Sequence, residues 1–239
     1  GLGASTRRDL SHKAVHSQFQ PAERHQGLYQ EEAIVYPPSF DTPNYGTPEL
    51  PTGSADSEPL RGRDYYGERR IPDWVKQQRE SWHGVDYMYH GDINFEEFFQ
   101  RYTETLMGID DSVGAVLDYL DANGLAEDTL VIYMGDNGFS FGEHGLIDKR
   151  HFYEESAKVP LLVRWPSRLQ GGAAIESLVQ NIDIAPTILE AAGLSMPSHM
   201  QGASFIPLFS REEIPWRDRI FYEYYWEMDF PQTPTMFGI

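Results

Sequence analysis

The segment between residues 94 and 134 constrains the fold more than any other part of the sequence, because a long helical pattern leads directly into a short apolar run. Apolar residues recur there at steps of three and four, which is the period of one buried face of an α-helix. Those residues are Phe95, Phe98, Phe99, Tyr102, Leu106, Ile109, Val113, Val116, Leu117 and Leu120. The spacing predicts a helix that begins at Phe95 and packs one face against a core.

Both ends of this helix carry residues that favour termination. Asn94 can accept a hydrogen bond from a free N–H group of the first turn, where the positive end of the helix dipole also favours Glu96 and Glu97. Gly124 suits the left-handed position just past the C-terminus. Gly108 lies inside the pattern, and because glycine weakens a helix interior we allow for a break near that residue.

Two apolar runs and a second helical pattern follow. Residues 129–134 and 159–165 are each too apolar to alternate between a buried and an exposed face, which is typical of strands in a parallel sheet covered on both sides. Residues 183–193 predict a short helix that ends at Gly193. A helix, two strands and a helix in this order favour an α/β fold with a mostly parallel sheet flanked by helices.

Residues 31–90 have a different character. They are rich in Pro, Gly, Tyr and charged residues and show almost no periodicity, as in Tyr36-Pro37-Pro38. A connection this long is unusual inside a compact domain, so we interpret it as a loop-rich surface insertion or a partly disordered segment. The helix–strand core is then expected within residues 91–225.

The charge balance limits the partners of the chain. It has 19 Lys and Arg against 37 Asp and Glu, a net charge of −18. Such a chain gains little from a phosphate backbone or an anionic bilayer, so we expect neither nucleic acid nor membrane as a partner. An anionic ligand would need a bound metal or a few local cations to reverse the field. The absence of cysteine excludes disulfides, zinc–thiolate sites and a thiol nucleophile within the sequence.

The residues most suited to chemistry lie in segment 135–149, directly after the first apolar run. In open α/β sheets, ligands bind beyond the carboxyl ends of the strands. Asp136 and Asn137 offer adjacent oxygen ligands of the hard kind that Ca²⁺ and Mg²⁺ prefer, and Lys149 could place a positive charge against an anion. The alternative is that Asp136-Asn137-Gly138 is simply a turn after a strand, as this combination often is.

The whole of segment 135–149 resembles an active-site segment from the C-terminal half of the sulfatase family, in the alkaline-phosphatase-like superfamily. Four more segments carry the same resemblance: Leu10–His16, Tyr153–Ser156, Val159–Pro166 and Asp183–Thr187. The similarity runs from about Leu10 to about Tyr225 and is softer, but present, toward bacterial N-acetylglucosamine-6-sulfatase-like enzymes for sulfated sugars. It implies that residues 1–239 form a partial sulfatase catalytic domain with an incomplete alkaline-phosphatase-like fold.

The resemblance also implies roles for individual residues. Asp136 and Asn137 match two of the family's Ca²⁺ ligands, with Mg²⁺ the less expected ion. Lys149 matches the lysine that contacts the sulfate and the leaving group, and His16 matches a histidine that donates to the same group, so both would serve substrate binding and catalysis. His12 is the competing candidate for the substrate-binding histidine.

Other histidines are given no chemical role. His144 matches a motif position, but we interpret it as a structural histidine packed against its loop. The histidines outside any motif are expected at surface or packing positions. They are His25, His83, His90, His151 and His199.

The family's nucleophile is missing from this sequence. It is a formylglycine made from cysteine or serine in a Cys/Ser-x-Pro-x-Arg motif, and the chain contains no such motif. Pro166-Ser167-Arg168 matches only the tail of the motif. Asp110-Asp111 resembles a metal-binding pair but falls within the predicted helix, where solvated charge is the better interpretation. We therefore expect a fragment of a sulfuric ester hydrolase that shows no turnover by itself.

Two alternatives remain open at this point. The first is a phosphate or phosphonate ester hydrolase of the same superfamily, and the second is a non-catalytic remnant that binds Ca²⁺ or glycans. The expected ligand is a small-molecule or oligosaccharide sulfate ester. The oligomeric state and the compartment are not indicated by the residues, although the resemblance implies a periplasmic, secreted or lysosomal location.

Overall fold

The computed structural model describes residues 6–16, 19–40, 84, 94–210, 214–229 and 233–239. Its dominant element is the helix α3, Phe95–Ala122. The Asn94 side chain accepts a hydrogen bond from the Glu97 N–H at 2.8 Å, which confirms the predicted start. The helix runs without interruption through Gly108, so the break that we allowed for does not form.

The end of α3 also follows the prediction. Gly124 adopts a φ of +65°, the left-handed conformation that glycine reaches without strain. The Leu125 N–H donates back to the Leu120 carbonyl at 2.9 Å and closes the last turn. A short 3₁₀ turn, η2 (Ala126–Asp128), then leads into the strand β1 (Val131–Met134).

The two apolar runs pair as strands, but in the opposite sense to the expected one. β1 and β2 (Leu161–Arg164) are antiparallel, with Val131 opposite Arg164 and Met134 opposite Leu161. The prediction of a mostly parallel sheet is therefore wrong for the described residues. A parallel pair needs a crossover element, whereas the intervening chain contains only the 3₁₀ turn η3 (Glu143–Gly145) and the one-turn helix α4 (Glu154–Ala157) and folds back on itself.

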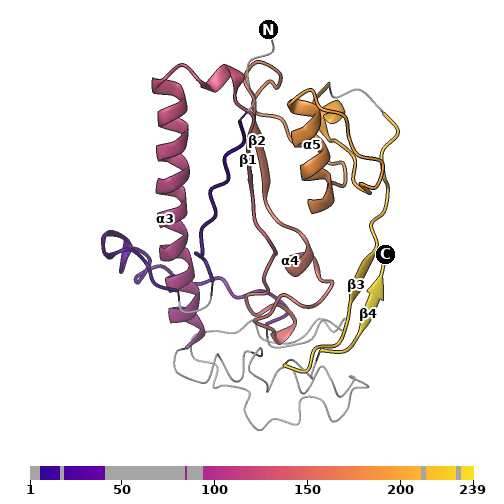
Figure 1. Ribbon diagram of the computed structural model, residues 1–239. Coiled ribbons are helices and arrows are strands. Elements are labelled where there is room, and N and C mark those ends of the chain that lie inside the picture. The colour runs from indigo at the N-terminus through magenta and orange to yellow at the C-terminus, as the bar shows by residue number, and fades with distance from the viewer. Residues whose placement is uncertain (1–5, 17–18, 41–83, 85–93, 211–213, 230–232) are drawn as a thin grey trace.

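The strands are also less covered than their composition predicted. All four residues of β1 are half-buried, and Leu162 on β2 is 59% exposed. In the view of Figure 1 the β1–β2 pair runs between α3 and α5 (Ile184–Ala191). Because the sheet has only two strands in the described part of the chain, its apolar residues lack the two-sided cover that a larger parallel sheet provides.

The C-terminal region is organised around a buried carboxylate. The 3₁₀ turn η4 (Asn181–Asp183) leads directly into α5, and the side chain of Asp183 is completely buried between them and the later chain. Another 3₁₀ turn, η5 (Ile206–Ser210), packs beside α5, and a second antiparallel pair is formed by β3 (Tyr222–Tyr224) and β4 (Met236–Gly238). The described chain is thus a partial α/β fold with two small sheets.

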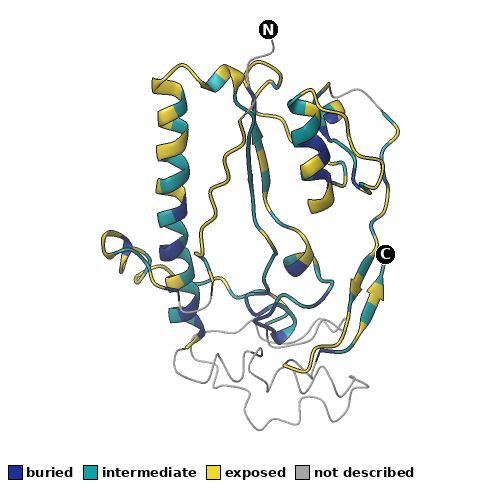
Figure 2. Ribbon diagram, in the orientation of Figure 1, coloured by how far each residue is buried: buried dark blue, intermediate teal, exposed yellow. Residues whose placement is uncertain are grey.

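The main apolar core lies at the N-terminal end of α3. Phe19, Phe95, Phe98 and Ile147 are buried together, and Val15 is among the apolar residues packed against them. Figure 2 shows buried residues concentrated on the lower half of α3 and in the loop below β1. This cluster fixes segment 135–149 against both the helix and the N-terminal segment.

Most of the proposed insertion at residues 31–90, with His83 and His90, lies outside the described residues, so the domain division stays a prediction. Within the described part of the chain, no helix is both long enough and apolar enough to cross a membrane.

Candidate active site

The loop that carries the candidate site leaves β1 and is held against the chain that returns to β2. The Gly135 N–H donates to the Pro160 carbonyl at 3.3 Å, and the Gly138 N–H donates to the Ser156 carbonyl at 3.0 Å. A side chain at Gly138 would place its Cβ 2.1 Å from the carbonyl oxygen of Glu155, so only glycine fits there. Asp136-Asn137-Gly138 is therefore a packed segment with a tight approach to α4, which is more than a solvent-exposed turn.

The two ends of this loop meet through side chains. The Lys149 ammonium donates to the Asn137 Oδ1 at 3.0 Å. The Asn137 N–H donates to the Asp136 Oδ1 at 2.9 Å, and the Asn137 Nδ2 donates to the Gly138 carbonyl at 2.7 Å. Asp136 is exposed, while Asn137 and Lys149 are half-buried. Three of the predicted site residues are thus brought into one contiguous group beside the end of β1.

Lys149 reaches Asn137 because its neighbours are fixed. Ile147 is completely buried and Asp148 is 1% exposed, and the Asp148 carbonyl accepts a hydrogen bond from the Ser140 N–H at 2.8 Å. The Asp148 carboxylate forms an ion pair with Arg150 at 2.6 Å. The lysine therefore projects from a short stretch anchored on both sides, which limits the positions that its ammonium can take.

Aromatic rings from both sides of Lys149 in the chain pack together. The His144 ring stacks on Tyr153 with centroids 3.8 Å apart, and His151 lies 5.9 Å from the same tyrosine. His151 is buried and its Nδ1 is 3.7 Å from the Asp148 Oδ2. The sequence analysis gave no role to Asp148 or Tyr153 and expected His151 at a surface or packing position, of which the structure shows the latter. The spacing of these residues in the sequence does not predict their contacts, because stacking and burial depend on the folded conformation of the loop.

The backbone and electrostatics of His144 agree with a packing role. It adopts a φ of +58° between Gly142 and Gly145, which also have positive φ. Burial lowers the pKa of His144, and the carboxylate of Glu155, 3.9 Å away, opposes this shift only partly. The ring is therefore neutral around pH 7, suited to stacking on Tyr153.

A second titratable group in the loop, Glu143, is shifted in the opposite direction. Burial raises the pKa of Glu143, and hydrogen bonds from its own backbone and from the Phe141 N–H, at 2.6 Å, counteract this only in part. The nearby Glu155 carboxylate raises the pKa further. Burial thus disfavours the charged forms of both His144 and Glu143 in this loop.

The two candidate histidines from the N-terminal segment occupy different surroundings. His12 is exposed, and its Nε2 lies 2.8 Å from the Ser112 Oγ on α3. His16 is also exposed, and its N–H donates to the Lys13 carbonyl at 3.0 Å. Its neighbour Val15 packs against the core cluster that contains Ile147, two residues before Lys149. The backbone at His16 is therefore tied to the loop of the candidate site, whereas the His12 side chain contacts the helix.

The donor chemistry of the loop fits part of a Ca²⁺ site. Asp136 and Asn137 supply a carboxylate and an amide oxygen, the ligands that Ca²⁺ prefers, but Ca²⁺ takes about six to eight of them. In the described residues no group of three or more His, Cys, Asp or Glu side chains could hold a metal. Asn137 Oδ1 also accepts from Lys149, so this oxygen would be shared between a metal and the ammonium. The residues present fit two positions of a larger site.

Asp111, of the Asp110-Asp111 pair on α3, has a structural role. The Arg24 Nε donates to the Asp111 Oδ2 at 2.9 Å, and the His25 Nε2 is 3.2 Å from the same oxygen. Asp111 therefore fastens the 3₁₀ turn η1 (Glu23–His25) to α3. This agrees with the interpretation that the pair at 110 and 111 is helix charge, and it shows His25 at a packing position.

Comparisons with known proteins find similar sequences. The family described as N-sulphoglucosamine sulphohydrolase, C-terminal, matches residues 142–239. The N-acetylglucosamine-6-O-sulfatase of Bacteroides thetaiotaomicron is 29% identical and aligns with 89% of this chain and 44% of its own length. The N-acetylglucosamine-6-sulfatase of Bos taurus is 38% identical and aligns with 62% of this chain and 27% of its own length.

A solved structure shows the same relationship in three dimensions. The structure of a protein in complex with its substrate, D-glucosamine-2-N,6-O-disulfate, superposes with a TM-score of 0.67 at 28% identity, over 90% of this chain and 50% of that chain. These similarities support the sulfatase family and relate the chain to the C-terminal portion of its members. It spans half or less of the length of these three proteins.

Proposed function

We propose that this chain forms part of a sulfuric ester hydrolase that acts on sulfated glucosamine residues of a carbohydrate. The observation that carries the proposal is the contact between Lys149 and Asn137 at the end of β1, in a loop whose second part, from residue 142, lies within the residues that the family model matches. It places the Lys149 ammonium next to an amide oxygen of the kind that Ca²⁺ binds. The relatives named for N-acetylglucosamine-6-sulfate hydrolysis and the structure solved with a disulfated glucosamine support this substrate class.

Lys149 is proposed to bind the sulfate group and to stabilise the leaving oxygen. Hydrolysis of a sulfate ester breaks the bond between sulfur and the ester oxygen, and negative charge collects on that oxygen as the bond breaks. A fixed ammonium at this position favours the transition state more than the ground state, because the charge that it faces is only then forming. The anchoring of Asp148 and Arg150 on either side holds the ammonium in position beforehand.

His16 is proposed as the second donor to the sulfate or the leaving oxygen. A protonated imidazole can give its proton to the departing alkoxide, so that the sugar leaves as an alcohol. Val15, which precedes His16, packs against the cluster that contains Ile147, and this supports His16 as the choice. The side chain of the competing candidate, His12, contacts Ser112. The nucleophile that attacks sulfur is proposed to lie outside this sequence, since none of its residues forms the family's nucleophile motif.

Asp136 and Asn137 are proposed to supply two of the ligands of a Ca²⁺ ion. When bound, such an ion would offset the charge on the sulfate oxygens. Asp136 is exposed and its carboxylate uses one oxygen to accept from the Asn137 N–H, which leaves the other oxygen available to a metal. We propose an extracytoplasmic location, consistent with the family resemblance.

A binding experiment with the 239-residue chain tests the sulfate assignment. N-acetylglucosamine 6-sulfate is titrated into the wild type, Lys149→Ala and Lys158→Ala in the presence of Ca²⁺. Lys158 is the matched control, because it is an exposed lysine of the same segment that pairs only weakly with Glu154 at 3.7 Å. We expect about a tenfold or larger loss of affinity for Lys149→Ala alone, and equal affinity of both variants would contradict the assignment.

The same titration separates the alternative reaction. A phosphonate or phosphate ester hydrolase would favour N-acetylglucosamine 6-phosphate over the sulfate, whereas a glycan-binding remnant would bind the unsulfated sugar equally well. The proposed function is supported by preference for the sulfate. The wild-type chain is expected to release no sulfate by itself, and measurable release would show that its own residues contain a nucleophile.

A further inference from the structure

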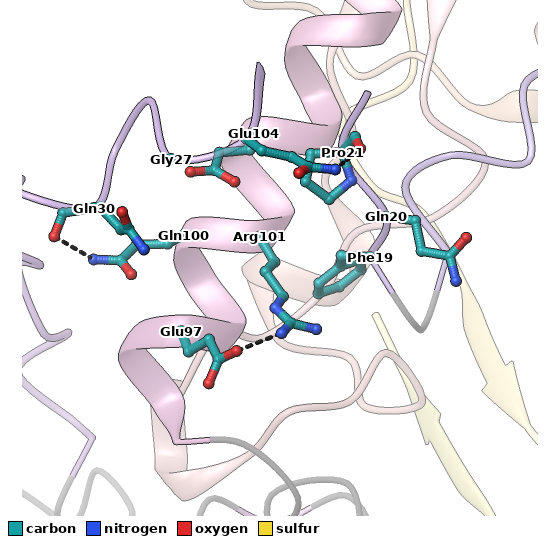
Figure 3. Close-up of a pocket in the computed structure, with 10 residues that line it drawn as sticks. Phe19, Gln20, Pro21, Gly27, Gln30, Glu97, Gln100, Arg101 and Glu104 are labelled. Atoms are coloured by element: carbon teal, nitrogen blue, oxygen red, sulfur yellow. Dashed lines mark hydrogen bonds and ion pairs between the residues drawn. The ribbon is translucent and has the colours of Figure 1, made fainter. Parts of the chain in front are cut away.

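A polar cavity lies beside α3, and none of its lining residues belongs to segment 135–149. It is lined by residues of segment 19–30 and by one face of the first half of the helix, and its volume is about 590 Å³ (Figure 3). That volume is within the range of about 300–1,000 Å³ that small-ligand sites occupy. Nothing in the proposed sulfatase chemistry uses it.

The wall formed by residues 19–30 is fixed to α3 at several points. The Tyr29 hydroxyl donates to the Met107 Sδ at 3.3 Å, and the Gln100 Nε2 donates to the Gln30 carbonyl at 3.4 Å. Further along, Arg24 pairs with Asp111. The cavity is thus bounded on both sides by chain that the fold holds in place, which reduces the ordering cost of binding a ligand there.

Glu104 is the residue that gives this cavity a chemical preference. It is only 5% exposed, yet among the described residues it accepts a single long hydrogen bond, from the Tyr29 N–H at 3.4 Å, and has no ion-pair partner. In Figure 3 its side chain lies between Pro21 and Gly27. A buried carboxylate normally has a cation and several donors around it. Glu104 therefore leaves most of its acceptor capacity available to a cationic ligand.

The other polar groups of the cavity suit hydroxyls. Gln26 and Gln100 each use one amide N–H in the fold, the former on the Pro21 carbonyl at 3.3 Å, and retain a second N–H and the amide oxygen. Gln30 adds a third amide to the lining. Among the described residues that line the cavity, Arg101 supplies the guanidinium, and it is paired with Glu97.

We propose that this cavity is a binding site for a hexosamine with a free amino group, separate from the catalytic loop. The ammonium of the sugar donates to the Glu104 carboxylate, and its hydroxyls exchange hydrogen bonds with the amides of Gln26, Gln30 and Gln100. A sulfate on the sugar is disfavoured here, because the cavity carries an excess of carboxylate over free cation. The site would hold an unsulfated amino-sugar unit while the catalytic loop requires a sulfated one.

The test compares glucosamine with glucose, which differs from it only by a hydroxyl in place of the ammonium. Each is titrated into the 239-residue chain at slightly acidic pH, and amide chemical shifts are followed by NMR. Glucosamine is expected to bind at least about tenfold more tightly than glucose, as expected for a charged hydrogen bond to a buried carboxylate. Shift changes are expected at residues 19–30 and 97–104.

Two variants locate the interaction. Glu104→Gln keeps the size of the side chain but removes its charge, and it is expected to lower glucosamine affinity to that of glucose. Glu96→Gln is the matched control, since Glu96 lies on the same helix, accepts from the Tyr36 hydroxyl at 3.0 Å and does not line the cavity. Retained glucosamine affinity in Glu104→Gln would overturn the proposal.

The ligands alone also test the proposal, even if Glu104→Gln fails to fold. Equal binding of glucose and glucosamine by the wild type would show that the charge is not recognised. Equal binding of ethylamine and glucosamine would show that the amides do not recognise the hydroxyls. Either result overturns the assignment to an amino sugar, and neither bears on the sulfate titration at Lys149.

Discussion

Replacing Asp183 should unfold the C-terminal region more readily than any surface substitution. The Asp183 carboxylate accepts from the Gln180 N–H and the Ala203 N–H, both at 2.8 Å, and from both terminal nitrogens of Arg217, one of them at 2.7 Å. It is completely buried. One side chain thus joins the turn before α5, the chain at residue 203 and the chain at residue 217.

The magnitude follows from the groups that the substitution leaves behind. Asp183→Ala strands a partly buried guanidinium and two backbone donors, and breaking one side of a buried ion pair costs about 3–5 kcal/mol. A domain is stable by only about 5–15 kcal/mol, so this loss is a large fraction of the total. Asp183→Asn keeps an acceptor oxygen but loses the charge, and we expect an intermediate loss.

Urea unfolding followed by circular dichroism measures the effect. The midpoint of Asp183→Ala should fall with an unchanged slope, because the surface exposed on unfolding stays similar. Asp218→Ala is the matched control, since Asp218 forms an exposed pair with the adjacent Arg219 at 2.8 Å, and its midpoint should not change measurably. If Asp183→Ala shifts the midpoint no further than Asp218→Ala does, the buried carboxylate does not hold this region together.

The pH dependence of the stability of the wild type also reports on the Asp183 carboxylate. Burial would raise the pKa of Asp183, but the hydrogen bonds from Arg217 and from the Ala203 and Gln180 N–H groups outweigh it, so the net shift is downward. A carboxylate with a lowered folded-state pKa stabilises the fold fully above its unfolded pKa of about 3.9. That contribution is lost as the pH falls through the lower folded-state pKa, and the Asp183→Asn variant should lack it.

Three further predictions concern the loop and the long helix. Asp136→Ala should weaken Ca²⁺ binding measured by calorimetry while the exposed Asp128→Ala control does not, and equal affinities would refute the metal assignment. Burial lowers the pKa of His144, so as the pH falls this residue takes up a proton more readily in the unfolded chain than in the folded one. The urea midpoint of the wild type should therefore decrease below a pH of about 6.5, and that of His144→Gln should decrease less. Parallel pH profiles of the two proteins would show that His144 does not contribute to the pH dependence of stability. Gly108→Ala, where a Cβ would contact nothing within 4 Å, should raise the stability by about 0.5–1 kcal/mol, and a lower melting temperature would show hidden strain in α3.

Much of the local structure could be predicted from the sequence, because local signals determine it. The start of α3 at Asn94 and its end before Gly124 follow from capping and from the apolar period, and both are confirmed. The break near Gly108 did not form, since a glycine costs a helix only about 1 kcal/mol and the flanking pattern is strong. The sense of the β1–β2 pair was predicted wrongly, because strand direction depends on the connection and apolar composition does not encode it.

The site could be predicted only in part. The sequence placed Asp136, Asn137 and Lys149 in one loop, and the structure brings the last two into contact at 3.0 Å. The stack of His144 on Tyr153 and the burial of Asp148 were not foreseen, because they depend on how the loop folds over α4. The roles of His16 and His12 stay predictions, as does the Ca²⁺ ion.

The pairing of Met134 with Leu161 has a consequence for how this site can change. Residues 135–160 leave the sheet and return to it at one point, so strand pairing has already brought the two ends of this excursion together. The entropy cost of closing a loop grows only with the logarithm of its length, so added residues at an exposed point would be inexpensive. Added residues at an exposed point between Lys149 and β2 would therefore lengthen the excursion without altering the strand pairing that holds its ends together.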